Sequence, residues 1–454
     1  MNIALVFPRD KYPTGDPPLG ISYIKSYIDK NSDCNVDVLD TTFDNSESNI
    51  VYFFKRKPYD IIGISVLTPM INNAIRIADI AKKINPDSKI VFGGPHPTVL
   101  PEESLRNKSV DAVVIGEGEE TFLEIVKKDC NFYNIRGIWF KENGLIVKNQ
   151  IREPIGDLNN LPFPSLDSLP MNEYIKNWFQ LDSVDPNLIG TNIIASRGCP
   201  YNCSFCQPTL EKIFGKFLRK RSPKNIIEEI IQLKEKFGIN AIMFQDDTLT
   251  CDHKWVFEIC DEIIDNNLNI IWGFNTRAGL VSKELLIKVK EAGARKIFLG
   301  IESASQRILN DIYNKNITTE QVINTVNLIK KFNFKIQGYF MIGAPTETVE
   351  EIEETIKLAK NLAIDEATFS ITTPLPCTYL YEKSKSLIAK DFSEFDYYKR
   401  TVYGKGCLTQ NQLDYLRRKA LLEFYLSRKR ISQTIKSFLS INGIRKSIKK
   451  LKRF

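Results

Sequence analysis

The chain has 454 residues, of which 43% are hydrophobic and 26% charged, and its formal net charge is +7. This length is too great for one ordinary core, so two or three domains are expected, and no apolar run is long enough to span a bilayer. Nine cysteines scattered over a long chain do not resemble a secreted disulfide framework. No basic-then-apolar leader precedes the first strand, so we expect a cytoplasmic protein.

Residues 1–130 alternate short apolar strands with helical patterns. Strands are expected at residues 3–7, 36–39, 61–66, 90–92 and 112–115, with helices such as 21–28 and 73–84 between them. This alternation predicts a parallel sheet covered on both faces, in the manner of a Rossmann-like α/β domain. Turn-forming residues follow several strands, and ligands of such a sheet bind at the carboxyl ends of its strands.

A connector at residues 131–190 separates this region from a second series of strands and helices. The connector contains an expected hairpin at 141–148. Further strands are expected at 192–195, 241–245, 270–274, 296–300, 335–342 and 366–371, with helices that include 223–237, 254–265, 283–292 and 350–362. Six such units predict a partial (β/α)6 barrel over residues 191–375, followed by a helical C-terminal region at 376–454.

Three of the nine cysteines, Cys199, Cys203 and Cys206, follow the first strand of the second series. The carboxyl end of a barrel strand is where barrel enzymes do their chemistry. Three thiolates can hold three irons of a [4Fe–4S] cube and leave the fourth iron open. A zinc site with a fourth ligand from elsewhere is one alternative, although neither His96 nor His253 is adjacent in sequence. The other alternative is that the three cysteines are structural and unrelated to one another.

The pattern Cys-x3-Cys-x-aromatic-x-Cys after such a strand resembles the radical S-adenosylmethionine (SAM) superfamily. In that family the open iron binds the amino and carboxylate groups of SAM, and an electron from the cluster cleaves SAM to a 5′-deoxyadenosyl radical. The resemblance places Phe205 near the adenine and Gly343 in the fifth-strand signature beside it. It also implies a reductant such as flavodoxin or ferredoxin.

Other strand ends keep the order of this family. Gln245, Asp246 and Asp247 end the second strand, where the family contacts the methionine amino group. Arg277 ends the third strand and Glu302 the fourth, where such a glutamate lies near the ribose or the substrate, so both are candidate catalytic residues. Each signal is weak alone, because the two aspartates could be helix caps and Arg277 could pair with a surface acid.

The first 130 residues resemble the cobalamin-binding domain that precedes this barrel in one branch of the superfamily. The residues that carry this resemblance are Pro18, Leu19, Gly20, Gly94, His96, Gly116, Glu117 and Gly118. Glycines let the backbone approach a flat macrocycle. The Asp-x-His-x-x-Gly motif of histidine-ligated cobalamin is missing. The alternatives are therefore that His96 only holds its loop, or that the sheet binds no corrin.

Together the resemblances imply a cobalamin-dependent radical SAM enzyme that methylates an unactivated carbon of a small-molecule substrate. A cobalamin-assisted cyclase or rearrangement enzyme, and a non-catalytic cobalamin or cluster sensor, are the alternatives. One departure from the family is Cys377, which stands where a Pro-Gly-Thr glycine is usual. We expect Cys377 to be a buried small residue.

The C-terminal residues 427–454 contain ten Lys or Arg and no Asp or Glu. A helix there would have one apolar stripe, formed by Phe438, Leu439, Ile441, Ile444, Ile448 and Leu451. Such a helix can lie on anionic lipid at the inner membrane surface, which would make a lipid substrate more plausible. A helix that packs on the protein or stays solvated is the alternative. Contact with nucleic acid is not expected, because no aromatic residues interleave the basic ones.

Overall fold

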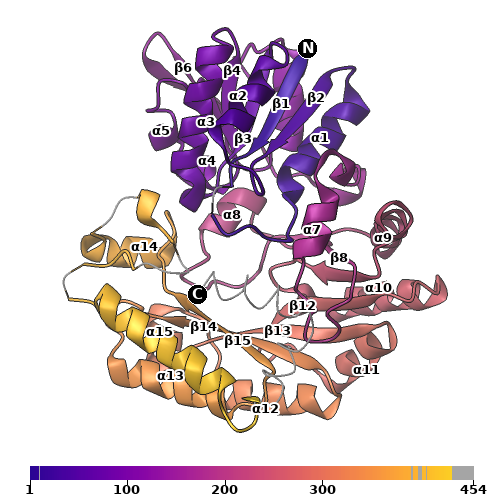
Figure 1. The fold of residues 1–454 in the computed structure, drawn as a ribbon, viewed down its shortest axis with the longest axis vertical. Helices are drawn as coiled ribbons and strands as arrows, with labels where there is room; N and C mark the ends of the chain where they lie inside the picture. Colours follow the sequence, from indigo (N-terminus) through magenta and orange to yellow (C-terminus); the bar gives the residue numbers. More distant parts are fainter. Residues whose placement is uncertain (10, 390–391, 397–400, 405, 432–454) are drawn as a thin grey trace. The chain divides into compact units, whose positions relative to one another are not determined.

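The computed structural model describes residues 1–9, 11–389, 392–396, 401–404 and 406–431 (Figure 1). The chain forms two compact units. The first contains residues 1–176 and 208–219, and the second contains residues 177–207 and the described residues from 220 onward. Among the described helices, none combines the length and the hydropathy that a bilayer crossing requires.

The first unit is built on a seven-stranded sheet with the order β2-β1-β3-β4-β5-β6-β7. Its strands are β1 (Asn2–Phe7), β2 (Asn35–Asp40), β3 (Ile61–Ser65), β4 (Lys89–Gly93), β5 (Ala112–Val114), β6 (Ile138–Glu142) and β7 (Leu145–Lys148). The first five pair in parallel, and the hairpin β6–β7 adds two antiparallel strands. The sequence therefore predicts both the parallel sheet and the hairpin correctly.

Helices cover both faces of this sheet because its strands are apolar on both sides. Ala4 and Val6 of β1 pack in a core with α2 and α3, whereas Ile3 and Leu5 pack in a second core with α1 and α6. The helices of this unit are α1 (Leu19–Asn31), α2 (Glu47–Lys55), α3 (Ile71–Ile84), α4 (Pro95–Val99), α5 (Pro101–Ser104), α6 (Glu119–Lys127), α7 (Met171–Asn177) and α8 (Thr209–Phe214).

The second unit is built on six parallel strands with the order β15-β14-β13-β12-β11-β8. These are β8 (Gly190–Ile193), β11 (Ala241–Phe244), β12 (Ile271–Arg277), β13 (Ala294–Glu302), β14 (Lys335–Ile342) and β15 (Glu366–Ile371). The connecting helices are α9 (Pro223–Phe237), α10 (His253–Asp265), α11 (Lys283–Glu291), α12 (Thr319–Lys331) and α13 (Val349–Asn361). The predicted partial barrel is thus confirmed. A short ladder of β9 (Ser196–Arg197) and β10 (Arg219–Lys220) lies beside it.

The segment before β8 packs on the amino half of these strands. Trp178 and Leu181 form an apolar cluster with Ala241, Met243 and Phe298. A Cβ on Gly190 would lie 2.1 Å from the Trp178 ring, so the indole needs glycine at the start of β8. The carboxyl ends of the strands, where barrel enzymes place their sites, are not covered by this segment.

The helical C-terminal region begins with α14 (Tyr379–Ser384) and continues with α15 (Gln410–Tyr425). Arg430 is buried and donates hydrogen bonds to the carbonyls of Lys360, Leu362 and Ile364, where α13 leads into β15. The start of the basic segment is therefore fixed to the partial barrel. The six residues of its predicted apolar stripe lie outside the described residues.

Candidate functional site

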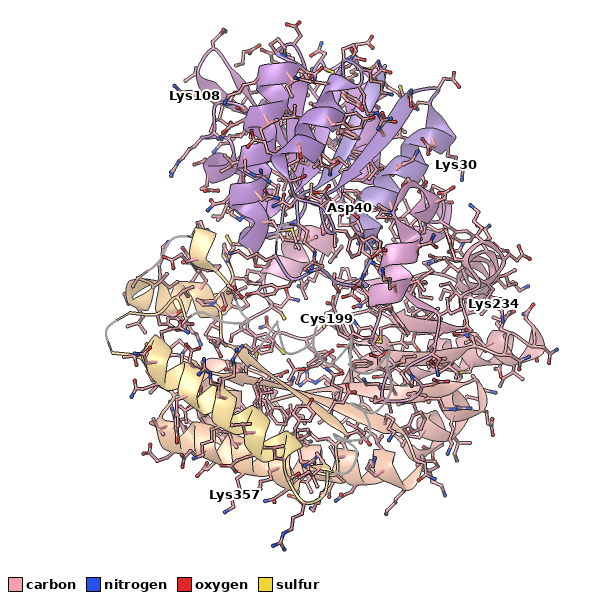
Figure 2. All side chains as sticks on the ribbon, in the orientation of Figure 1. Lys30, Asp40, Lys108, Cys199, Lys234 and Lys357 are labelled. Atoms are coloured by element: carbon pink, nitrogen blue, oxygen red, sulfur yellow. The ribbon has the colours of Figure 1, made fainter. Side chains whose placement is uncertain are left out.

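The three cysteines lie on one loop that follows β8 and β9, and Figure 2 labels the first of them, Cys199. The segment after β13 holds this loop. Ser204 donates its amide to the carbonyl of Tyr313 over 2.8 Å and its hydroxyl to the carbonyl of Ile312. Ile312 ends a single π-helical turn, η5 (Ile308–Ile312), a feature that is frequent at functional sites. Protein contacts alone thus fix the loop between the second and third cysteines.

Each of the three cysteines keeps part of its surface exposed, but protein atoms crowd the sulfurs. This desolvation raises the pKa of all three thiols, so a bound metal has to stabilise the thiolates. In the part of the chain that the structure describes, no three Cys, His, Asp or Glu side chains converge on one metal ion. Three soft sulfur donors on one loop suit an iron–sulfur cube, which is larger than a single ion.

Phe205 packs edge-on against Tyr313, with the ring centroids 5.4 Å apart. The same apolar cluster includes Met341 of β14 and Ala344 of the turn that follows. The structure therefore brings the aromatic residue of the cysteine motif next to the fifth-strand signature that contains Gly343.

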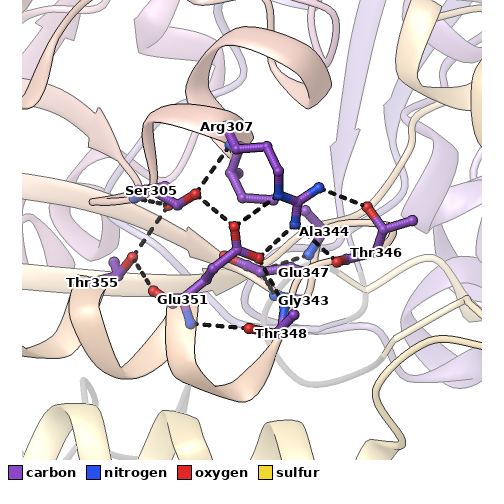
Figure 3. Close-up of polar contacts among 11 residues, drawn as sticks. Ser305, Arg307, Gly343, Ala344, Thr346, Glu347, Thr348, Glu351 and Thr355 are labelled. Carbon is purple, nitrogen blue, oxygen red and sulfur yellow. Dashed lines mark hydrogen bonds and ion pairs between the residues drawn. The ribbon is translucent and has the colours of Figure 1, made fainter.

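Glu347 closes the turn after β14 (Figure 3). Its Oε2 accepts hydrogen bonds from the amides of Gly343 and Ala344 over 2.6 and 2.9 Å, and its Oε1 has no hydrogen-bond partner among the described residues. Burial raises the pKa of this carboxyl to about 8, although the two amides lower it. Gly343 has a φ of +82°, and a Cβ there would lie 2.8 Å from Leu413 of α15, so the turn requires glycine.

Arg307 joins the ends of β13 and β14 (Figure 3). Its guanidinium donates two hydrogen bonds to the Glu351 carboxylate, over 3.0 and 2.6 Å, and two to the hydroxyl and carbonyl oxygens of Thr346, over 3.1 and 3.0 Å. Thr346 has a φ of +65°, which a β-branched residue rarely adopts. Arg307 thus stabilises a strained turn. No local sequence pattern predicts this role of Arg307, because its partners lie 39 and 44 residues further along the chain.

Glu302, a candidate catalytic residue, is buried at the end of β13 with a φ of +65°. The pairing of β13 with β14 shifts register between Gly300 and Glu302, so this strand end is irregular. The Glu302 carboxylate forms an ion pair with Lys315, which is also buried. Lys315 lies in the loop before α12, where no sequence motif points to it.

Arg277, the other candidate catalytic residue, is only 9% exposed at the end of β12. Its guanidinium carbon lies 3.8 Å from the centroid of the Tyr201 ring, within the cysteine loop, and Nη2 donates to the carbonyl of Lys315. No acid among the described residues forms an ion pair with it. The alternative of a surface ion pair is therefore wrong, because burial removes Arg277 from the surface.

The two aspartates after β11 differ in their surroundings. Asp246 is buried and accepts hydrogen bonds from the Ser196 hydroxyl and the Ala195 amide; burial raises its pKa to about 6, although these bonds lower it. Asp247 keeps an exposed side chain, but surrounding protein atoms desolvate it and raise its pKa to about 6. Neither caps a helix, since Asp252 caps α10, so the cap alternative is wrong. Gln245 is half-buried beside them.

Cys377 precedes the Thr378 cap of α14, with a φ of +62°. It is half-buried and not fully buried as expected from the sequence. The reason is local, because the chain turns here to bring α14 onto the cysteine loop. The amides of Tyr379 and Leu380 donate to the carbonyls of Gln207 and Ser204 over 2.7 and 2.8 Å.

In the first unit, the candidate cobalamin residues lie in loops at the carboxyl ends of strands, the end at which Figure 2 labels Asp40 of β2. Gly94 has a φ of +95°, and a Cβ there would lie 3.2 Å from the backbone of Val66. Only glycine suits this close approach of two strand ends. Gly116 has a φ of +82°, and Gly118 precedes α6. These bare backbone segments suit a large flat ligand.

His96 and Glu117 already have protein partners. His96 is fully buried, with Nδ1 3.2 Å from the Thr68 hydroxyl and Nε2 2.8 Å from the Glu103 carboxylate. The Glu117 carboxylate pairs with Arg219 and accepts the amide of Ile155 over 2.8 Å. Both side chains therefore hold their loops. Near α1, Pro18 is the N-cap residue, Leu19 is buried and Gly20 is exposed.

Comparison with known proteins covers both units. Residues 193–359 match the Radical SAM superfamily, and residues 11–126 match the B12 binding domain. The uncharacterized methyltransferase PH0819 of Pyrococcus horikoshii is 38% identical over 442 residues, which are 94% of this chain and 93% of the relative. The anaerobic magnesium-protoporphyrin IX monomethyl ester cyclase of Rubrivivax gelatinosus is 31% identical over 395 residues, which are 84% of this chain and 69% of the relative.

A solved structure shows the same fold. The radical SAM methyltransferase TsrM of Kitasatospora setae, with cobalamin and a [4Fe–4S] cluster bound, aligns with a TM-score of 0.70. The alignment covers 86% of this chain and 76% of TsrM, at 16% identity. The family models and the 38% identical relative decide the relationship: the chain is an enzyme of the radical SAM superfamily, in the branch that joins a cobalamin-binding domain to the radical SAM barrel.

Proposed function

We propose that this enzyme transfers a methyl group to an unactivated carbon of a small-molecule substrate. The observation that supports this most is the presence, in one chain, of the cysteine loop and of a cobalamin-binding domain. The 38% identical relative, named an uncharacterized methyltransferase, matches this chain over 93% of its own length. When bound, the cluster supplies the electron that cleaves SAM and cobalamin supplies the methyl group.

In the second unit, different residues would hold the cluster and bind the methionine part of SAM. Cys199, Cys203 and Cys206 hold the cluster and leave one iron open. Asp247, exposed and without a hydrogen-bond partner among the described residues, would accept a hydrogen bond from the ammonium of SAM, with Gln245 and Asp246 beside it. A carboxylate is a strong acceptor for a cationic amine.

The adenine and the reacting carbon require other contacts. Phe205 and the Gly343 turn offer an apolar surface and bare backbone for the adenine. Glu302, held by Lys315, faces the ribose or the substrate in this proposal.

In the first unit, cobalamin would lie on the strand-end loops. The backbone at Pro18, Leu19, Gly20, Gly94, Gly116 and Gly118 would contact the corrin or its tail. His96 and Glu117 would shape these loops without ligating cobalt, because their polar atoms already have protein partners.

A cobalamin-assisted cyclase is the second candidate, favoured by the 31% identical relative of that name. One experiment separates the two. The protein is reconstituted anaerobically with iron, sulfide and cobalamin, reduced, and mixed with methyl-labelled SAM. Label on protein-bound cobalamin together with S-adenosylhomocysteine supports methyl transfer. 5′-Deoxyadenosine without either product supports the cyclase, and no turnover of SAM at all contradicts both and favours a sensor.

We also propose that the basic tail contacts anionic lipid at the inner membrane surface. The seven Lys or Arg of residues 432–454, without any acid, support this. The full chain and a chain that ends at Ile431 are sedimented with vesicles that contain or lack anionic phospholipid. Only the full chain should bind, only to anionic vesicles, and less at high salt. Equal sedimentation of the two chains contradicts the contact.

A further inference from the structure

Arg277 carries a buried positive charge. A guanidinium does not lose its proton in a protein, and buried charges are normally paired with an opposite charge. The polar and aromatic partners of Arg277 are the carbonyl of Lys315 and the ring of Tyr201. Neither is an anion, so within the described residues the charge has no counter-ion.

The acidic side chains in this part of the second unit do not act as a counter-ion for Arg277. Glu302 is paired with Lys315. Asp246 is bonded to the Ser196 hydroxyl and the Ala195 amide. Asp247 forms no ion pair with Arg277, and burial alone shifts the pKa of its carboxyl. The positive charge at Arg277 therefore requires an anion that the polypeptide does not provide.

The guanidinium lies directly on the cysteine loop. Tyr201 stands between Cys199 and Cys203 in sequence, and the guanidinium carbon is 3.8 Å from its ring centroid. The positive charge of Arg277 lowers the pKa of the Cys199 and Cys203 thiols, whereas burial raises it. An anion bound by these cysteines would be within reach of the charge.

We propose that Arg277 is the counter-ion of the cluster held by Cys199, Cys203 and Cys206, and that it makes this cluster easier to reduce. The inference rests on the proposed function. Three thiolates outweigh the charge of an oxidised cubane core by one unit, and reduction adds one more negative charge. A buried cation beside the cluster stabilises the reduced form more than the oxidised form. The electron is thus accepted from a milder reductant.

The test is a redox titration of the reconstituted full chain, followed by electron paramagnetic resonance without SAM. Arg277→Gln should shift the midpoint potential to a more negative value, with the iron content unchanged, whereas Arg277→Lys should keep it near wild type. Arg295→Gln is the matched control. Within the described part of the chain, the hydrogen bonds of the Arg295 guanidinium also go to backbone carbonyls alone, those of Lys290 and Ala294, but Arg295 lies at the amino end of β13. Its removal should leave the potential unchanged.

An unchanged potential in Arg277→Gln overturns the inference. If SAM then binds more weakly to that variant, Arg277 pairs with the cofactor carboxylate instead. If Arg277→Gln does not retain iron, retention by Arg277→Lys supports a role of charge, and loss from both variants overturns it. A wild type that binds no cluster contradicts the proposed function itself, which separates the two failures.

Discussion

The Lys315 ammonium and the Glu302 carboxylate form an ion pair whose side chains are only 6% and 8% exposed. Glu302 also has a positive φ at an irregular strand end. A backbone of this kind persists only where the surroundings enforce it. The pair therefore holds the end of β13 in one conformation beside the cysteine loop.

Removing Lys315 from this ion pair should destabilise the fold, because the buried Glu302 carboxylate then has no cation beside it. Lys315→Met leaves an uncompensated carboxylate in the interior and should lower the free energy of unfolding by about 3–5 kcal/mol. The double variant Glu302→Gln/Lys315→Met should lose less than the two single variants together, because no buried charge remains. Denaturant unfolding of all three gives the comparison.

An exposed pair provides the control. Lys360 and Glu423 are 45% and 36% exposed, so Lys360→Met should change stability by less than about 1 kcal/mol. If Lys315→Met and Lys360→Met lower the free energy of unfolding by similar amounts, the buried pair stabilises the fold no more than the exposed pair does.

Cys377 tests a second strained position. Cys377 has a φ of +62°, which glycine adopts without strain. In Cys377→Gly the relief of strain should offset the greater freedom of the unfolded chain. The free energy of unfolding of this variant should therefore stay within about 1 kcal/mol of wild type. Cys377→Val should lower the free energy of unfolding by more than this, because a β-branched residue is disfavoured at positive φ. Thermal unfolding ranks the variants. A valine variant as stable as the glycine variant would mean that backbone strain is not limiting here.

The alternation of apolar segments predicts most strands and helices of this fold. The strand expected at residues 366–371 and the helix expected at 223–237 begin and end where β15 and α9 do. Both are short amphipathic or apolar segments flanked by polar residues, for which local pattern is sufficient. The spacing of Cys199, Cys203 and Cys206 after a strand also predicts the cysteine loop, since the three lie within eight residues.

Contacts between distant strand ends could not be found in this way. Lys315 meets Glu302 across a π-helical turn, and Arg307 meets Thr346 across 39 residues. Glu117 pairs with Arg219 across 102 residues. Glu302 and Thr346 have a positive φ, and all three pairs join segments far apart in the chain, neither of which a local periodicity encodes.

The Arg307 contacts with Thr346 lead to a prediction about SAM. Arg307→Ala releases both oxygens of Thr346, so the turn that carries Gly343 should lose its fixed shape and bind SAM about tenfold more weakly, or about 1.4 kcal/mol. Thr346→Gly in the same background should restore part of the affinity, because glycine adopts the positive φ without support. Equilibrium dialysis of SAM against reconstituted protein, with iron content as the control, measures this. Absence of rescue would place the role of Arg307 elsewhere.

Glu347 should make stability depend on pH. Burial raises the pKa of its carboxyl to about 8 in the folded chain, against about 4.3 in an unfolded chain. Between these values the folded state keeps a proton that the unfolded state has lost. The stabilisation from this proton is therefore complete below about pH 4, decreases as the pH rises, and is lost above about pH 8, with a slope of up to about 1.4 kcal/mol per pH unit.

Glu347→Gln removes this proton but keeps an oxygen that can accept from the amides of Gly343 and Ala344. The variant should gain stability relative to wild type as the pH rises from 5 to 8, and the difference should stop growing above that range. Glu350→Gln, at an exposed acid in the first turn of α13, just after the turn that contains Glu347, should follow the wild type over this range. Denaturant unfolding at each pH gives the curves. Parallel curves for wild type and Glu347→Gln would mean that the buried carboxyl is ionised throughout, and that the amides of the turn are enough to hold its charge.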